Sequence, residues 1–343
     1  MRSRRKGFVL DMTLKLEDKW VWDLWLAPEK VDGKWHIFFL QAPRSLIDPD
    51  LRHASATVGH AVSADLIEWD YLGTALEPGP VGAWDDRATW TGSIVKSDSG
   101  LWHMFYTGTN KSKENGFVQR IGLATSTDLT TWSKQEGFVT EADSRWYERI
   151  AQVESEKQSG QPSWYEEAWR DPWVFRDPTS NVWVMLITAR SNVGAYDARG
   201  TIGVARSKDL LNWTVCEPLN VESEFGHYEV PQFFESTDGE LLISFCLASN
   251  NHATTRLARG ERAWTGNGIM RSSTFDGVWS VEGEPFLEDP HYAARLIQEN
   301  DQLLAIAWLN FVGKDFQGII DNPIEVTQAF EEKYSLHIKS EKR

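Results

Sequence analysis

Three acidic residues occupy matching places in a sequence unit that recurs along this chain. Each lies 12 residues before an apolar residue that opens a second apolar run: Asp23 before Trp35, Asp171 before Trp183 and Glu229 before Leu241. Neighbouring carboxyl groups raise one another's proton affinity, so one member of a group can stay protonated while another ionises. A proton donor paired with an ionised carboxylate is the apparatus that cleaves a glycosidic bond.

The unit that carries these acids is a predicted β-hairpin. In its first copy, two apolar runs within 20–41 flank the turn Val31-Asp32-Gly33, and Asp-Gly between such runs is a strong hairpin signal. The other copies have DSG, TSN, TDG or END at the same point. Two of the five copies carry Trp90 and His291 where the others carry an acid, 12 residues before Trp102 and Leu303.

A second element follows most hairpins and completes the repeat. The pattern Gly-x-Ala-x-Ser-x-Asp-Leu-x-x-Trp occurs at 59–69, 122–132 and 203–213, with a degenerate form at 270–279. It predicts a strand, a polar turn anchored by Asp, and a further strand. Each repeat then has about four strands, which is typical of a β-propeller blade. We predict an all-β fold: one domain, 1–343, forming a five-bladed β-propeller whose blades start near 20, 88, 168, 228 and 289.

The propeller prediction gives the acids a common location. Equivalent positions on the innermost strands form a ring, so Asp23, Trp90, Asp171, Glu229 and His291 are expected to meet at one mouth of the axis. Two other interpretations exist: the acids pair with arginines, or three acids and His291 bind a hard cation. We predict catalysis, with no metal and no cofactor.

Composition restricts the partners. The formal net charge is −15, which argues against nucleic acid or an anionic membrane surface and favours a neutral carbohydrate substrate. Two cysteines, Cys216 and Cys246, provide no disulfide framework, and the basic N-terminus lacks the apolar core of a signal peptide. No apolar run reaches membrane-spanning length. These features predict a cytoplasmic protein.

Two segments interrupt the repeats. The polar stretch 42–57 separates the second and third strands of the first blade, and such loops often carry specificity. The longest insertion, about 137–167, is highly charged, and residues 143–156 have the spacing of an amphipathic helix. It precedes Arg170-Asp171 directly, so it either leans over the acids or forms a solvated excursion.

Several segments resemble glycoside hydrolase family 32, which includes invertases, inulinases and levanases. The segment 59–78 is similar to the family's GHAVSxDLxxWxxLxxALxP pattern, and 90–93 to its WSGS segment. Residues 169–172 match its RDP motif, 229–231 resemble its ECP motif with Val230 replacing Cys, and 286–293 are similar to its FYA segment. The resemblance covers about 20–325. The first motif departs: Trp22-Asp23-Leu24-Trp25 is closer to the VWDxWPL of family 68, the levansucrases.

The resemblance implies roles for individual residues. Asp23 is the nucleophile that attacks a fructofuranosyl unit, Glu229 is the acid and base, and Asp171 stabilises the transition state. The implied reaction retains configuration through a covalent fructosyl-enzyme. The residues expected to contact substrate are Trp22, Trp25, Gln41, Trp90, Thr91, Arg170, His291 and Tyr292.

Other readings of the same residues stay open. A family 43 propeller would use two Asp and one Glu to hydrolyse arabinosides or xylosides with inversion of configuration. A fructosyltransferase would form the same covalent intermediate and pass the fructosyl unit to a sugar. A sugar-binding propeller would bind carbohydrate without catalysis. Family 32 usually adds a C-terminal β-sandwich, which this chain is too short to hold. The propeller flank left uncovered would favour a homo-oligomer.

Overall fold

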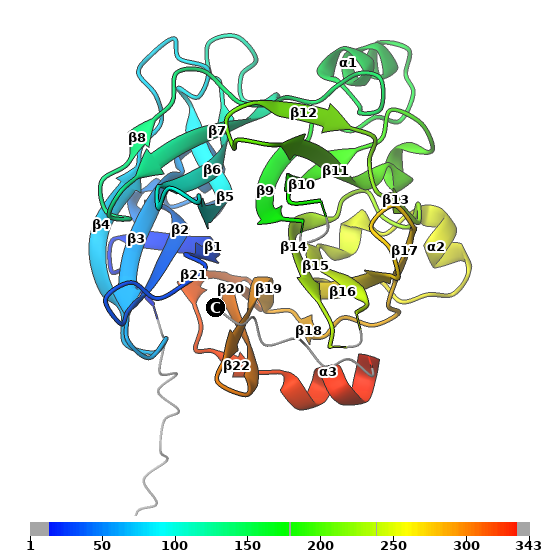
Figure 1. Cartoon of the computed structure of the whole chain (residues 1–343). Helices are drawn as coiled ribbons and strands as arrows, with labels where there is room; N and C mark the ends of the chain where they lie inside the picture. Colours follow the sequence, from blue (N-terminus) through cyan, green and yellow to red (C-terminus); the bar gives the residue numbers. More distant parts are fainter. Residues whose placement is uncertain (1–13, 178–179, 238, 335–343) are drawn as a thin grey trace, which may run out of the picture.

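Five β-sheets surround a central axis in the computed structural model of this chain (Figure 1). The structure describes residues 14–177, 180–237 and 239–334. The first strands of the five sheets contact one another in a closed cycle, β1 to β5, β9, β14, β19 and back to β1. The prediction of a five-bladed all-β propeller is therefore confirmed.

The first three blades are antiparallel sheets of four strands in sequence order. Blade 1 consists of β1 (Lys19–Leu26), β2 (Trp35–Pro43), β3 (Thr57–Ser63) and β4 (Asp70–Leu76), with the 3-10 helices η1 (Arg44–Leu46) and η2 (Pro49–Ser55) between β2 and β3. Blade 2 consists of β5 (Ala88–Lys96), β6 (Trp102–Thr109), β7 (Gln119–Ser126) and β8 (Ser133–Lys134). Blade 3 consists of β9 (Trp169–Arg176), β10 (Trp183–Arg190), β11 (Gly200–Ser207) and β12 (Trp213–Cys216), with η3 (Tyr196–Ala198).

The last two blades depart slightly from this plan. Blade 4 consists of β14 (Glu229–Glu235), β15 (Leu241–Leu247), β16 (Gly266–Ser272) and β17 (Val278–Val281), extended by the short strands β13 (Asn220–Val221) and β18 (Leu287–Glu288). Blade 5 consists of β19 (His291–Glu299), β20 (Gln302–Val312) and β21 (Asp315–Ile320), with β22 (Ile324–Glu325) paired to β20. The helices are α1 (Ile150–Gln158), α2 (Thr254–Ala258), α3 (Thr327–Tyr334) and η4 (Ser249–Asn251).

The repeated Asp-Leu-x-x-Trp element forms the turn that the sequence predicts. Asp65 Oδ1 accepts hydrogen bonds from the backbone N–H groups of Ile67 and Glu68, both at 2.9 Å, and Leu66 is buried beneath the turn. Asp128 and Asp209 make the same pair of contacts in blades 2 and 3. Because the side chain satisfies the turn's free donors, this motif fixes the outer edge of the first three blades.

The start of the described chain joins the last blade. Leu14 and Ile320 exchange backbone hydrogen bonds of 3.0 and 3.1 Å, which connects the segment before blade 1 to β21 of blade 5. The described ring is therefore linked between its first and last blades by backbone bonds as well as by side-chain packing.

The insertion packs against blades 2 and 3 and is only partly helical. Its helix α1 begins at Ile150, seven residues later than the sequence predicts. The preceding residues form a turn on the Asp143 carbonyl, and Tyr147 then pairs with Ser191 beside β10 and is fully buried. This tertiary contact overrides the local helical pattern, and it corrects the expected helix 143–156.

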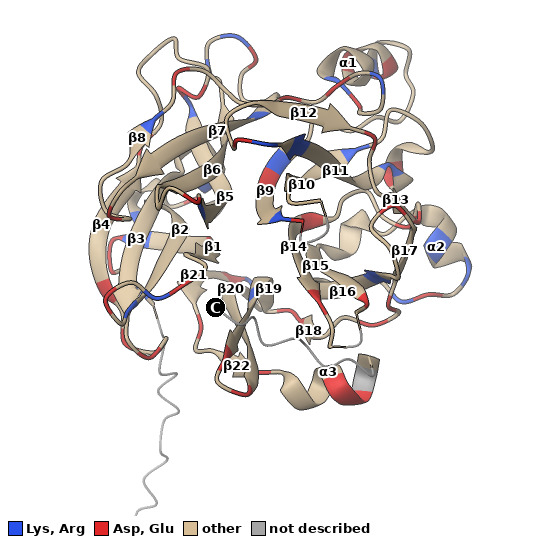
Figure 2. Ribbon diagram, viewed as in Figure 1, with Lys and Arg blue, Asp and Glu red and all other residues tan. Residues whose placement is uncertain are grey.

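Charged residues are concentrated on loops and outer strands (Figure 2). The inner strand β9 is an exception, since basic and acidic positions are adjacent on it. Within the described ranges, no helix is long and apolar enough to cross a membrane. Cys216 and Cys246 are both free thiols.

Candidate active site

Every inner strand carries a β-bulge near its start. One extra residue interrupts the pairing of β1, β5, β9, β14 and β19 with the second strand of its blade. The backbone has positive φ at four of these bulges: 30° at Asp23, 58° at Asp171, 53° at Val230 and 49° at Ala293. Positive φ is costly for residues other than glycine, and such strain concentrates at functional sites. The bulges re-aim the side chains beside them.

The bulges also correct the register expected from the repeat. Asp23 and Asp171 are the bulged residues of their strands, whereas Glu229 lies one residue before the bulge, as Trp90 does in blade 2. His291 lies a further residue upstream in blade 5. The hairpins differ slightly in length. Residues that all lie 12 positions before the second apolar run therefore do not occupy equivalent positions relative to the bulge.

Asp23 is held by two uncharged donors from neighbouring blades. The Thr91 hydroxyl donates to its Oδ2 at 2.7 Å, and the Trp308 indole N–H donates to its Oδ1 at 2.9 Å. Both carboxylate oxygens are thus oriented by hydrogen bonds from uncharged groups. The side chain remains partly exposed, so a reacting atom can approach it.

Asp171 is buried and receives hydrogen bonds from blades 3 and 4. Its Oδ2 accepts from the Thr188 hydroxyl at 2.8 Å and from the backbone N–H of Val230 at 3.3 Å. That N–H is available to a side chain because the bulge removes Val230 from the backbone pairing of β14 with β15. Proline follows both bulged residues, at Pro172 and Pro231, where a missing N–H costs no ladder bond.

Glu229 is clamped between a cation and a phenol. Arg170 Nη2 donates to Glu229 Oε1 at 2.6 Å, and the Tyr292 hydroxyl donates to Oε2 at 2.6 Å. Arg170 also pairs with Glu166 at 3.2 Å and with Asp171 at 3.5 Å. One guanidinium therefore faces three carboxyl groups, which cannot all be neutralised by it, so the cluster favours holding a proton.

Burial dominates the electrostatics of the two aspartates. Desolvation raises the pKa of Asp23, with Thr91 opposing the shift and Glu229 adding to it. Desolvation likewise raises the pKa of Asp171 to about 7, although Arg170 opposes this, and the charges of Asp23 and Glu229 contribute further. Mutually perturbed acids of this kind are typical of catalytic sites.

The Asp171 pKa predicts a pH-dependent stability cost. The native state holds this proton up to about pH 7, whereas an unperturbed Asp releases it near 3.8, so the free energy of unfolding falls as pH rises between these values. Asp171→Asn cannot ionise and escapes this loss. The melting temperature of the variant minus that of the parent should grow by several degrees from pH 4 to pH 8. A difference that stays constant over this range would contradict the assigned shift.

Four of the residues expected to contact substrate lie with the acids. Thr91 binds Asp23, while Arg170 and Tyr292 bind Glu229. Trp90 is partly exposed, and its indole N–H donates to the carbonyl of His53 at 2.7 Å.

Three of the other four are buried, which corrects the expectation for them. Trp22 and Trp25 are 1% and 0% exposed, so their rings lie in the core. Gln41 is 1% exposed, and its amide is bonded within blade 1 to Thr57, Thr74 and Tyr71. His291 is half-buried and its ring pairs with Asp321 at 2.9 Å, so its contact with substrate stays a prediction. Successive strand residues face opposite sides of a sheet, and the short aromatic run around Asp23 does not indicate which side is the core.

Sequence reasoning missed His53, which lies beside the site. The His53 ring lies edge-on to Trp22 and Trp90, at 6.1 and 6.2 Å. Desolvation and the cations Arg52 and Arg170 lower the pKa of His53 to about 3, so its ring is neutral at ordinary pH. His53 belongs to the 42–57 stretch that the sequence singles out, but only the fold brings it to this place.

The metal alternative finds no support among the residues that the structure describes. In that part of the chain, no group of three or more His, Cys, Asp or Glu side chains is arranged to hold a metal ion. His291, the proposed fourth ligand, is engaged by Asp321.

A separate cavity lies at the opposite ends of the inner strands. It has a volume of about 780 Å³, is mainly apolar, and is lined by the downstream halves of β1, β5, β9, β14 and β19. Arg295 lies between this cavity and the acids: it donates to the carbonyls of Leu24, Val230 and Pro231, and its guanidinium stacks on Trp173 of blade 3 at 4.8 Å. We place the chemistry at the acids because the titratable groups converge there.

Comparison with known proteins agrees with this arrangement. Residues 26–337 match the model of the glycosyl hydrolases family 32 N-terminal domain, a range that starts just after Asp23. A levanase from Bacillus sp. (strain L7) is 31% identical over 192 residues, which are 51% of this chain and 18% of the levanase. The insoluble isoenzyme 7 of β-fructofuranosidase from Oryza sativa subsp. indica is 28% identical over 215 residues, 61% of this chain and 31% of that enzyme.

The fold itself recurs in a solved structure. Inulosucrase from Halalkalicoccus jeotgali bound to kestose superimposes with a TM-score of 0.74 at 19% identity, covering 93% of this chain and 89% of that one. The matched regions span less than a third of the two curated relatives. Because the family model matches most of its length, the chain belongs to the glycosyl hydrolases family 32, through that family's N-terminal domain.

Proposed function

We propose that this protein is a retaining glycosidase that cleaves β-fructofuranosides, such as sucrose, fructooligosaccharides or fructan, through a covalent fructosyl-enzyme. The observation that carries the proposal is the different support of two carboxyl groups in one site. Among the described residues, Asp23 accepts hydrogen bonds from two neutral donors, Thr91 and Trp308, whereas Glu229 lies against both a cation and a phenol. Family membership and the two fructan- and sucrose-cleaving relatives support the fructosyl unit as substrate.

The proposed first step is attack by Asp23 on the anomeric carbon. Glu229 donates its proton to the leaving oxygen as the bond to the fructosyl unit breaks, which leaves an ester between Asp23 and the sugar. Negative charge then moves onto Glu229, where Arg170 and Tyr292 are already placed to stabilise it. The preorganised donors need no rearrangement at that moment.

The proposed second step runs the same groups in reverse. Glu229, now ionised, takes a proton from water, which attacks the anomeric carbon and releases Asp23. A sugar hydroxyl in place of water would give transfructosylation. Asp171, in its ionised form, stabilises positive charge on the ring during both steps, and its hydrogen bonds from Thr188 and Val230 fix its direction.

Product analysis tests this function. The purified protein is incubated with sucrose, with short inulin- and levan-type oligosaccharides, and with arabinan as a control. Free fructose or new fructosylated sugars are expected. In added methanol, retention predicts methyl β-D-fructofuranoside rather than the α-anomer. Release of arabinose alone would indicate the inverting alternative, and binding without turnover would indicate a sugar-binding propeller.

A further inference from the structure

Tyr165, near the end of the insertion, is an exposed aromatic side chain whose neighbours in sequence contact the surroundings of the proposed acid. It is 54% exposed, although it follows a tryptophan and precedes two buried glutamates. The next residue, Glu166, pairs with Arg170 at 3.2 Å, and Arg170 binds Glu229 at 2.6 Å. Desolvation and then Glu166 raise the pKa of Tyr165 to about 12, and the charge of Glu229 also acts on it. The phenol therefore stays neutral at ordinary pH.

The ring of Trp164 stacks against the ring of Tyr165. The two rings stack with centroids 5.1 Å apart and planes at 28°. The centroid of the Trp164 ring lies 4.7 Å from that of His227, which precedes Glu229 by two residues. The Arg190 guanidinium lies 4.7 Å from the centroid of the same Trp164 ring. Tyr165 is thus exposed on a support that is itself packed against the site.

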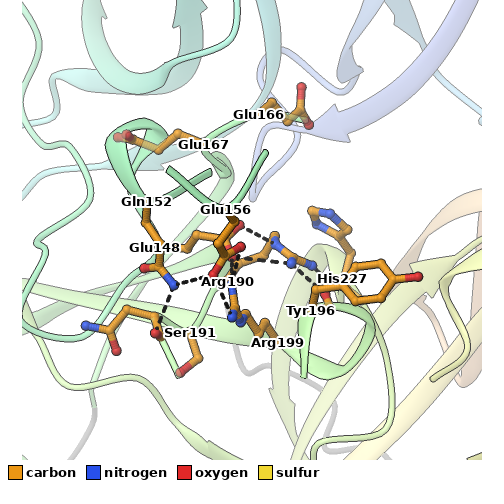
Figure 3. A network of polar contacts seen from close by, with 12 residues as sticks. Glu148, Gln152, Glu156, Glu166, Glu167, Arg190, Ser191, Tyr196, Arg199 and His227 are labelled. Atoms are coloured by element: carbon orange, nitrogen blue, oxygen red, sulfur yellow. Dashed lines mark hydrogen bonds and ion pairs between the residues drawn. The ribbon is translucent and has the colours of Figure 1, made fainter. Parts of the chain in front are cut away.

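A buried ionic network fixes this support. Arg190 and Glu148 pair at 2.9 Å with both side chains fully buried, and Arg199 pairs with Glu148 at 2.6 Å and with Glu156 of α1 at 2.9 Å. Figure 3 shows these carboxylates facing the two guanidinium groups. Because Trp164 packs against this network, a Tyr165 ring stacked on it should lose less conformational freedom on binding a ligand than an unsupported ring would.

The chemistry of the site decides which part of a substrate meets Tyr165. A general acid must contact the oxygen that leaves, so the leaving group lies on the Glu229 side, while the nucleophile attacks the opposite face of the fructosyl ring. Tyr165 is linked to the site through Glu166, Arg170 and His227, all on the Glu229 side. A sugar that leaves there, or one that arrives as acceptor, would lie against this ring.

We propose that Tyr165 is the platform for the sugar on the far side of the scissile bond, stacking on the apolar face of its ring. The inference rests on the proposed function and adds a specificity to it: the insertion makes the protein prefer fructosides whose leaving group is itself a sugar. The same contact retains an acceptor sugar, so Tyr165 also sets the share of transfer relative to hydrolysis.

The test compares two substrates with the same fructosyl unit. Sucrose has a glucosyl leaving group, whereas methyl β-D-fructofuranoside releases only methanol. Tyr165→Ala should lower kcat/KM for sucrose by about three- to tenfold, as loss of one stacking contact predicts, with less than a twofold effect on the methyl fructoside. Tyr165→Phe should retain the parent value. Phe138→Ala removes another exposed aromatic of the insertion and should change neither substrate.

A binding measurement separates this inference from the proposed function. In an Asp23→Asn background, Tyr165→Ala should weaken sucrose binding by a similar factor in calorimetry and leave fructose binding unchanged. An equal effect of Tyr165→Ala on both substrates, or none on sucrose, would overturn the platform while leaving fructoside cleavage intact. If the unmutated protein neither cleaves nor binds either substrate, the proposed function fails and the platform with it.

Discussion

Asp23→Asn is expected to reduce kcat for sucrose by at least about 10²–10⁴-fold. Asparagine has the shape of the carboxylate but cannot form the ester with the fructosyl unit, so the loss should appear on every fructoside. Thr91 can still donate to the amide oxygen, whereas the amide N–H₂ cannot accept from Trp308, so we expect only a modest change in melting temperature.

Glu229→Gln separates the acid from the nucleophile. It should slow sucrose cleavage by a similar factor, but much less with p-nitrophenyl β-D-fructofuranoside, whose leaving group departs without a proton. Steady-state kinetics on both substrates, with melting curves for both variants, make the comparison. Asp98→Asn, at an exposed hairpin turn, is the matched control and should retain activity. Near-parental turnover by either site variant would remove that residue from the mechanism.

Glu148→Ala is expected to lower the free energy of unfolding by about 3–5 kcal/mol. The Glu148 carboxylate accepts hydrogen bonds from Arg190 and Arg199, and the side chains of Glu148 and Arg190 are both fully buried. Removing it leaves a buried guanidinium without its main counter-charge, and desolvation already lowers the pKa of Arg190. The same variant should loosen the insertion from β10.

Urea denaturation measures this effect, and α1 offers a control. Glu154→Ala removes an exposed glutamate from the same insertion and should change stability by less than about 0.5 kcal/mol. A loss below about 1 kcal/mol for Glu148→Ala would mean that the network fixes position without contributing to stability.

The blades were predictable because their signals are local. The Asp-Gly turn after Val31 and the Asp65-Leu66 turn specify structure within a few residues, and each repeat reinforces the assignment of the others. The acids were found for the same reason, since each lies at the same distance before the second apolar run of its hairpin. The start of α1 was not predictable, because the contact of Tyr147 with blade 3 decides it.

Contacts within the site depended on the third dimension. No local pattern indicates that Trp308 donates to Asp23, since 285 residues separate them. The register of the ring was missed although a signal existed: Pro172 and Pro231 lie in strands that otherwise read as regular, and proline there indicates a bulge. Reading them as bulges would have moved Glu229 one place relative to Asp171, whereas blade 5 has no proline after its bulge and offers no such signal.

The Arg295 side chain closes the central axis of this propeller below the acids. It extends from blade 5, bonds to the backbone of blades 1 and 4, stacks on blade 3, and is 1% exposed. A polysaccharide therefore cannot thread along the axis from one mouth to the other. Any carbohydrate that reaches the acids would have to enter and leave by the same mouth, so a released product would compete with the next substrate molecule for that entrance.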